Sequence, residues 1–279
     1  MNQSPESDDA SVNTTPRSGG GFAWIVREVK GLLRRRKLTR RYKRMIAALQ
    51  ASNPSVFDIE CARAGFRPWL QSKLYSKGPL IDGLPWLPFS AIEKLESHLT
   101  ASSRVFEYGA GGSTIFFSSR VAELVSVEHD RDWYVATQEA MEPRAKRKGF
   151  QWKGLFVEPR KLSPEALFAA PEDPHGYSSS SGAFKQHCFR DYVSTINAYA
   201  DAYFDVILID GRSRPSCFLH AMSKVRPGGV IVLDNAERPS YGAVERLAQG
   251  SGFQVSEVWG PGPYNDYCWR TIFLQRPTI

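Results

Sequence analysis

An apolar run passes into a glycine-rich turn in the segment RVFEYGAGGSTIFF, residues 104–117. Val105 to Tyr108 have the composition of a buried strand, and a helix is expected to begin near Thr114. Glycines at such a junction let the backbone approach a ligand closely, and the helix N-terminus presents free amide groups. A tight strand-to-helix turn also needs glycine for steric reasons, so both interpretations of the turn stay open.

Strands and helices alternate from this turn onward, which is typical of a parallel sheet covered by helices on both faces. The last two candidate strands are separated by a loop too short for a crossover helix, so they must pair antiparallel. The sequence therefore predicts an α/β fold with a doubly wound, mostly parallel, Rossmann-like sheet, a terminal antiparallel hairpin and an N-terminal helical extension. The candidate strands are 105–108, 124–128, 150–157, 204–210, 230–234, 253–259 and 267–275.

The net charge of +7 is concentrated in one segment of the 279-residue chain. Residues 21–50 carry ten basic residues against one acid, whereas residues 51–279 carry 25 of each. A neutral main domain lacks the broad basic face that nucleic-acid binding usually needs. The question of a macromolecular partner therefore belongs to residues 21–50.

The chain divides into four predicted parts: a disordered tail (1–20), a basic amphipathic helical arm (21–50), a helical lead-in (51–102) and a main domain (103–279). The arm is expected either to contact a membrane surface or an anionic polymer, or to pack on its own domain or a second subunit. Its apolar residues, at helical spacing, are Phe22, Ile25, Val29, Leu32 and Leu33, followed by Leu38, Tyr42, Met45 and Leu49.

The remaining sequence signals concern compartment and local structure. No apolar segment is long enough for a membrane span, and no signal peptide is visible, so a cytoplasmic location, peripheral to a membrane if the arm binds one, is expected. Prolines in 51–89 predict short helical pieces. Ser90 and Glu93 have the spacing of a capping box. The four cysteines form no CxxC pair, which argues against a zinc site or a disulfide framework.

Two acidic residues give the glycine-rich turn its chemical character. Glu107, two residues before the first glycine, would repel a pyrophosphate but suits a cationic ligand such as a sulfonium. The third glycine of the dinucleotide fingerprint is replaced by Thr114, which also argues against NAD. Glu128 follows Gly109 by 19 residues, a spacing at which a carboxylate reaches ribose hydroxyls, although a strand-end acid also serves as a helix cap.

With two further motifs the chain resembles the class I S-adenosylmethionine-dependent methyltransferases. These motifs are Asp210, which closes the fourth strand, and Arg226-Pro227-Gly228-Gly229 before the fifth. The resemblance covers residues 88–279 and implies a seven-stranded sheet and an S-adenosylmethionine site. The cofactor-binding residues that it implies are Glu107, Tyr108, Gly109, Gly111, Ser113, Thr114, Glu128, His129 and Asp210.

The acceptor is inferred partly from motifs that the chain lacks. It has neither the [D/N]-P-P-[Y/F] tetrad of amino-methylating nucleic-acid enzymes nor a Pro-Cys nucleophile. We therefore expect O-methylation of a small-molecule or glycan-type acceptor, with Asp210 and Arg212 as catalytic residues. Arg212 and Arg214 either clamp an anionic group of the acceptor or pair with nearby acids such as Asp234. The alternatives are an RNA methyltransferase that uses the basic arm, and a non-catalytic nucleotide-binding or membrane-associated scaffold.

A partial resemblance to the catechol-type O-methyltransferases implies a magnesium site. The residues that correspond to its ligands are Asp210, Asp234 and Asn235, at the ends of the fourth and fifth strands. Oxygen ligands of this kind suit Mg²⁺, which would lower the pKa of an acceptor hydroxyl. Ser213 stands where that family has its lysine base, so the identity of the general base is open.

Overall fold

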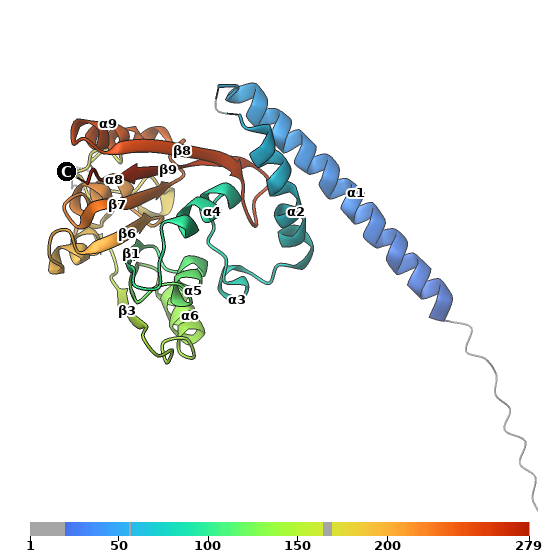
Figure 1. The fold of residues 1–279 in the computed structure, drawn as a ribbon, viewed down its shortest axis with the longest axis horizontal. Helices are drawn as coiled ribbons and strands as arrows, with labels where there is room; N and C mark the ends of the chain where they lie inside the picture. Colours follow the sequence, from blue (N-terminus) through green and yellow to red (C-terminus); the bar gives the residue numbers. More distant parts are fainter. Residues whose placement is uncertain (1–19, 56, 164–168, 279) are drawn as a thin grey trace, which may run out of the picture.

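The computed structural model describes residues 20–55, 57–163 and 169–278, and all but the last residue of the expected N-terminal tail lies outside this range. Seven strands form a sheet in the order β3-β2-β1-β6-β7-β9-β8, in which β9 is antiparallel to both of its neighbours (Figure 1). The strands are β1 (Arg104–Tyr108), β2 (Glu123–Glu128), β3 (Gln151–Phe156), β6 (Phe204–Ile209), β7 (Val225–Asp234), β8 (Gln254–Pro261) and β9 (Cys268–Gln275). The predicted mostly parallel sheet with a terminal hairpin is confirmed.

The sheet is apolar on both faces because its central strands alternate between two hydrophobic clusters. Val206 and Leu208 of β6 point into one cluster, whereas Ile207 and Ile209 point into the other. The first cluster lies under α4 (Phe89–Ser97), α5 (Gly112–Ser118) and α6 (Arg131–Met141). The second lies under α7 (Arg190–Ser194), α8 (Arg214–Ala221) and α9 (Gly242–Gly250). This burial on both faces explains why the strands read as continuous apolar runs.

A short antiparallel ribbon, β4 (Arg160–Lys161) with β5 (His187–Cys188), lies outside the main sheet and was not predicted. Strands of two residues are too short to give a periodic signal in the sequence. The remaining short elements are the 3-10 turns η1 (Gly182–Phe184), η2 (Thr195–Ala198) and η3 (Pro239–Tyr241).

Two predictions for residues 51–102 are wrong in detail. The prolines do not break the segment throughout, because α2 (Ile59–Tyr75) contains Pro68 and continues through it; α3 (Pro79–Asp82) and α4 follow. The capping box at Ser90 is absent, since α4 begins at Phe89 and makes no side-chain capping hydrogen bond. The Ser90 hydroxyl is buried and has no hydrogen-bond partner.

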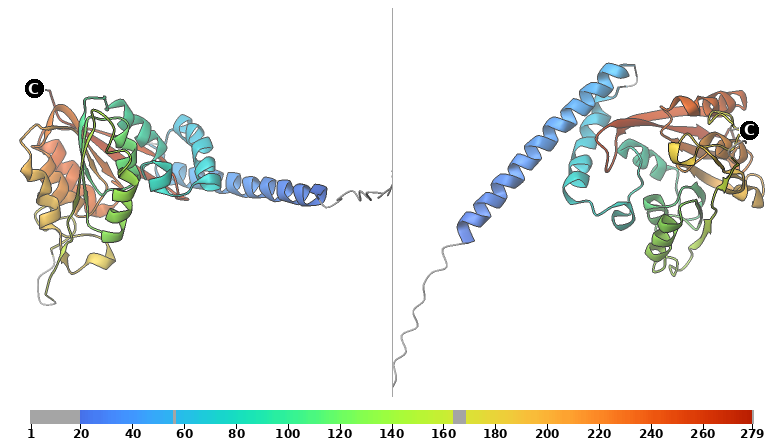
Figure 2. Two further views of the ribbon diagram at one scale, coloured as in Figure 1. Left: turned by 90° about the horizontal axis from the view of Figure 1, so that it is seen from below. Right: turned by 180° about the vertical axis from the view of Figure 1, so that it is seen from behind.

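The predicted basic arm is a single helix, α1 (Gly20–Ser52), whose C-terminal part packs on the domain. Tyr42 and Met45 are buried with Trp69 of α2 in a third apolar cluster. Trp69 donates its indole N–H to the carbonyl of Asn265 at 2.9 Å, which fixes α2 to the loop between β8 and β9. The N-terminal part of α1 projects away from the rest of the described chain (Figures 1 and 2).

Within the described part of the chain, no helix is long and apolar enough to cross a membrane. Cys61, Cys188, Cys217 and Cys268 are free thiols.

Candidate active site

A cavity of about 820 Å³ lies at the carboxyl ends of β1, β2, β6 and β7. Ligand sites of open α/β sheets lie at this edge, because the strand-to-helix loops converge there. The structure brings most of the predicted site residues into its wall. They are Gly109, Gly111, Ser113, Glu128, His129, Asp210, Arg212, Asp234 and Asn235. Of the other predicted residues, Glu107, Tyr108 and Thr114 do not line the cavity.

The glycine-rich turn packs closely against other parts of the protein. Gly109 has a φ of +94°, and a Cβ atom there would lie 2.9 Å from the backbone nitrogen of Gly211. A Cβ atom on Gly111 would lie 3.1 Å from the indole nitrogen of Trp133. Both glycines are therefore required for steric reasons, because they let the ends of β1 and β6 and the start of α6 meet around the cavity.

Glu107 stabilises this turn through hydrogen bonds. Its carboxylate is fully buried and accepts hydrogen bonds from Ser113 and Ser126, both at 2.6 Å, and from Thr114. Thr114 in turn accepts the amide N–H of Gly111 at 2.8 Å. Burial raises the pKa of Glu107 to about 7, while the hydroxyl donors oppose this shift. The expected direct contact of Glu107 with a cationic ligand does not fit its position. Its oxygens accept hydrogen bonds from the protein, and it does not line the cavity.

Glu128 lies at the end of β2 and faces the cavity. One carboxylate oxygen accepts the backbone N–H groups of His129 and Asp130 at 2.7 and 2.8 Å, and the other accepts that of Ala110 at 3.1 Å. Three amide donors fix the carboxylate without neutralising its charge with a cation. The oxygen that accepts the amide of Ala110 has capacity for a further donor. The carboxylate is thus held rigidly at the cavity wall and can accept hydroxyl groups.

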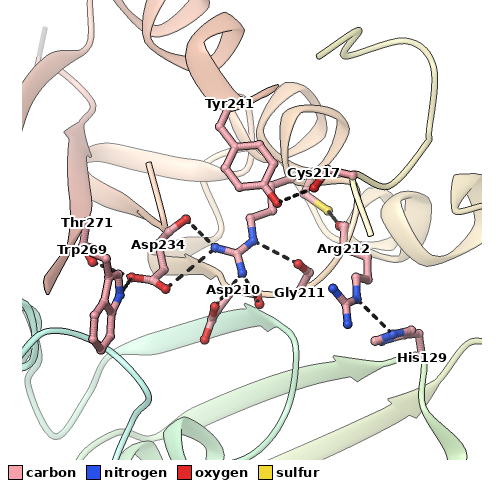
Figure 3. A network of polar contacts seen from close by, with 11 residues as sticks. His129, Asp210, Gly211, Arg212, Cys217, Asp234, Tyr241, Trp269 and Thr271 are labelled. Atoms are coloured by element: carbon pink, nitrogen blue, oxygen red, sulfur yellow. Dashed lines mark hydrogen bonds and ion pairs between the residues drawn. The ribbon is translucent and has the colours of Figure 1, made fainter. Parts of the chain in front are cut away.

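His129 and Arg212 form a pair beside Glu128. The Nε atom of Arg212 donates to Nε2 of His129 at 3.3 Å (Figure 3). In a neutral imidazole the proton is therefore on Nδ1, which lies 2.7 Å from a Glu128 oxygen in a geometry that makes no hydrogen bond. Arg212 also lies over the ring of Phe184, 5.4 Å from its centroid. These contacts place Arg212 next to the acid that ends β2.

Arg214 occupies the space between the acids that end β6 and β7. It is 5% exposed, and it donates to the carboxylate and carbonyl of Asp210, both at 2.9 Å, to the carbonyl of Gly211 at 3.0 Å and to the carbonyl of Asp234. Figure 3 shows this network, with Asp210, Gly211 and Asp234 grouped around one side chain. The clamp on an acceptor expected of Arg214 is therefore wrong, and the alternative pairing with nearby acids is what the structure contains.

One guanidinium faces two buried carboxyl groups, so their pKa values shift together. Asp234 accepts hydrogen bonds from Trp269 at 2.9 Å and Thr271 at 2.6 Å through the same oxygen (Figure 3). Burial, and then the charge of Asp210, raise the pKa of Asp234 to about 7. Burial also raises the pKa of Asp210, against the neighbouring arginines. Because the Asp210 side chain is 25% exposed and that of Asp234 only 2%, we assign the charge to Asp210 and the proton to Asp234.

The magnesium site implied by Asp210, Asp234 and Asn235 does not fit this arrangement. Arg214 already pairs with Asp210, and one Asp234 oxygen is taken by Trp269 and Thr271. The described residues contain no cluster of three or more acidic, histidine or cysteine side chains that could hold a metal ion. A guanidinium takes the position between the two acids that the prediction gave to the metal. Ser213, in the place of the family's lysine base, is buried outside the cavity wall.

Several residues of the cavity wall were missed by sequence reasoning. Trp133 donates its indole N–H to the carbonyl of Ala110 at 2.6 Å and covers the glycine-rich turn. Trp133 follows the helix cap Asp130 by three residues. This position in the sequence is only a weak indication that its side chain packs on the glycine-rich turn. Other missed residues of the wall include Pro79, Trp86, Asp132, Phe184, Arg238, Asn265, Tyr267 and Trp269.

No protein-family model matches the chain, and no curated protein matches its sequence. Solved structures that superpose on it include an O-methyltransferase from Bacillus cereus in complex with SAH, with 16% identity over 75% of this chain and 95% of that chain (TM-score 0.48). The O-methyltransferase TomG from Streptomyces achromogenes, in complex with SAM, has 18% identity over 78% and 100% (TM-score 0.48). An rRNA methylase from Streptococcus thermophilus has 9% identity over 67% and 95% (TM-score 0.45).

The topology itself defines the fold class. Numbered along the chain, the seven strands of the main sheet lie in the order 3-2-1-4-5-7-6, and the seventh runs antiparallel. With the Glu-x-Gly-x-Gly turn after the first strand, the chain has the class I S-adenosylmethionine-dependent methyltransferase fold.

Proposed function

We propose that the protein is an S-adenosylmethionine-dependent methyltransferase that methylates a hydroxyl group of a small-molecule or glycan-type acceptor. The observation that carries the proposal is the Glu128 carboxylate, which three backbone amides hold at the cavity wall beside the glycine-rich turn. An acid fixed in this way at the end of the second strand suits a pair of ribose hydroxyls.

The donor half of the site is the part of the cavity wall formed by Gly109 to Ser113 and by Glu128 to Trp133. In the proposal Glu128 accepts hydrogen bonds from the ribose hydroxyls, and the side chains of His129 and Trp133 line the same end of the cavity. When bound, S-adenosylmethionine supplies a methyl group on a positively charged sulfur. The acids of the cavity wall favour such a positively charged ligand, and Glu107 contributes by holding the turn in shape.

The acceptor half of the site lies at the ends of β6 and β7. Asp234 is the proposed general base, because its second carboxylate oxygen makes no hydrogen bond and its pKa of about 7 suits proton removal near neutral pH. Asp210 and Arg212 remain the proposed charged groups around the reacting atoms. Arg238 also lines the cavity, forms no ion pair within the described part of the chain and is proposed to hold an anionic group of the acceptor.

Calorimetric titration with S-adenosylmethionine and S-adenosylhomocysteine, with NAD as control, tests the donor half directly. We expect micromolar binding of the first two and none of NAD. Binding should also raise the free energy of unfolding by about 2.7 kcal/mol at a hundredfold excess over the dissociation constant. Absence of binding to all three would contradict the proposal. Binding without methyl transfer to a broad panel of hydroxylated acceptors would favour a non-catalytic protein.

A further inference from the structure

An apolar stripe remains uncovered on the projecting part of α1. We define the outer segment of α1 as residues 27–37. Val29, Leu32 and Leu33 lie on this segment and are 50%, 52% and 57% exposed. Their spacing of three and four residues places them on one face of the helix. Three exposed aliphatic side chains side by side on a charged helix indicate a binding surface.

This stripe faces away from the domain. Val29 and Leu38 are nine residues apart, as are Leu33 and Tyr42, and nine residues correspond to about two and a half helical turns. The outer stripe therefore lies on the side of α1 opposite to the stripe that packs on α2. Rotation of the helix to cover one stripe would expose the other, so the domain itself cannot be the partner of both.

Unpaired cations continue the exposed face toward the domain. Arg36, Arg40 and Lys43 follow Val29 by seven, eleven and fourteen residues, which is the same face of the helix. They form no salt bridge with any described residue, whereas Arg41 on a different face pairs with Asp266 at 2.5 Å. The outward face of α1 is thus apolar from Val29 to Leu33 and basic from Arg36 to Lys43.

The position of this face is fixed by contacts of α1 with α2. Arg34 donates to the carbonyl of Lys73 at 3.0 Å, and Arg35 donates to the hydroxyl of Tyr75 at 2.9 Å. These contacts come from the other side of the helix and hold it at the end of α2. The exposed face is therefore presented on a helix that is anchored from Arg34 onward.

We propose that this face of α1 binds the surface of a membrane that contains anionic lipids. In this proposal the three aliphatic side chains enter the boundary between the headgroups and the acyl chains, and the cations pair with anionic headgroups. A nucleic acid would be bound by the cations alone and leaves the aliphatic stripe unexplained. A second copy of the chain is disfavoured, because residues 21–50 carry ten basic residues against one acid and two such helices repel each other.

Vesicle co-sedimentation of the full chain tests the proposal. The probes are vesicles of phosphatidylcholine alone and vesicles with about one third phosphatidylserine. Two triple variants separate the components of the face, namely V29S/L32S/L33S and R36Q/R40Q/K43Q. The control triple variant R131Q/K146Q/K148Q removes the same charge from cations elsewhere on the surface. Arg131 and Lys146 are 66% and 75% exposed, and Lys148 is also exposed.

We expect binding to the anionic vesicles only. Each α1 variant should weaken it about tenfold or more, whereas the control should change it less than about twofold. All of the altered residues are exposed, so the thermal unfolding temperature of the variants should remain unchanged. The readout does not involve methyl transfer, so it is independent of the proposed function.

Four outcomes would overturn the proposal. They are no binding to anionic vesicles, undiminished binding of V29S/L32S/L33S, equal loss in the control, and tighter binding to RNA than to vesicles. The second and fourth would favour an anionic polymer. Self-association that V29S/L32S/L33S abolishes, in the absence of vesicle binding, would assign the face to a second copy of the chain.

Discussion

The two halves of the cavity both place acids at strand ends, but they hold those acids differently. In the donor half, Glu128 is held by three backbone amides and pairs with no lysine or arginine among the described residues. In the acceptor half, Arg214 binds Asp210 and the carbonyl of Asp234. Backbone amides fix a carboxylate and leave its charge available. In the acceptor half one guanidinium serves two buried acids, and burial together with the charge of Asp210 favours a proton on Asp234. Under the proposed function, a carboxylate binds hydroxyl groups in one half and transfers a proton in the other.

Replacement of Asp234 by asparagine should have the largest effect. Asparagine keeps an oxygen for Trp269 and Thr271 but cannot remove a proton, so we expect a rate loss of about 10²- to 10⁴-fold once an acceptor is known. A base acts only when ionised, so the wild-type rate should rise as the pH passes about 7 and then level off. A pH profile of kcat measures both effects. A wild-type profile without this rise would remove Asp234 from the mechanism.

The raised pKa of Asp234 also predicts a change in stability with pH. The folded state holds this proton up to about pH 7, whereas the ordinary value is 3.8. Between these values the folded state binds more protons than the unfolded state, so stability falls as the pH rises. Asp234→Asn should remove part of that fall in urea unfolding experiments at pH 5 to 8. A parallel decline in both proteins would contradict the assignment of the proton.

Arg214→Met should destabilise the fold by about 3–5 kcal/mol, because it leaves a buried carboxylate without its partner. Arg120, which pairs with Glu96 at 2.9 Å near the surface, offers a matched control, and Arg120→Met should cost less than about 1 kcal/mol. Urea unfolding compares the two. Addition of Asp210→Asn to the Arg214 variant should recover part of the loss. Equal effects at the two arginines would show that the pair with Asp210 does not hold the acceptor half together.

Glu128→Gln should weaken donor binding about 10- to 150-fold, because hydrogen bonds from the ribose hydroxyls to a charged carboxylate are lost. The amide nitrogen would replace one acceptor oxygen and face backbone donors. Glu123→Gln, at the other end of β2 and bound to the hydroxyl of Tyr203, is the control and should leave affinity unchanged. Calorimetry with S-adenosylhomocysteine gives both affinities. Undiminished affinity of the Glu128 variant would place the ribose elsewhere.

Gly109→Ala should destabilise the fold by about 1–3 kcal/mol. Gly149 provides a control with a similar backbone conformation, since its φ is +78°, but a Cβ atom there would meet no atom within 4 Å. The cost at Gly149 therefore measures the conformation alone, and the excess at Gly109 measures the contact with Gly211. Thermal unfolding of the two alanine variants gives the difference. If the two costs are equal, close packing of the β1 and β6 ends does not require the glycine.

The sheet and the donor half were accessible to sequence reasoning because their signals are local. Apolar runs of strand length mark β1, β2, β6 and β7, and the spacing from Gly109 to Glu128 spans one turn, one helix and one strand. The acceptor half depends instead on where one long side chain points. Nothing in the order Asp210-Gly-Arg-Ser-Arg214 tells which arginine turns inward, and this choice overturned both the clamp and the metal interpretation.

The N-terminal helix shows the same limit at larger scale. The spacing of its apolar residues predicted an amphipathic helix, and α1 is continuous from Gly20 to Ser52. Which stripe meets the domain depends on α2, whose Trp69 supplies the apolar surface under Tyr42 and Met45. A contact between two elements is a tertiary property, and single-sequence periodicity does not contain it.

The place of β9 in the sheet has a consequence for synthesis of the chain on the ribosome. β9 is made after β8 but lies between β7 and β8, and it carries Trp269 and Thr271, the partners of Asp234. Until residues 268–275 have left the exit tunnel, β7 has an open edge and the acceptor half of the cavity lacks a wall. The nascent chain therefore depends on β9 to complete the sheet, and ribosome stalling before that point would leave an aggregation-prone strand edge exposed.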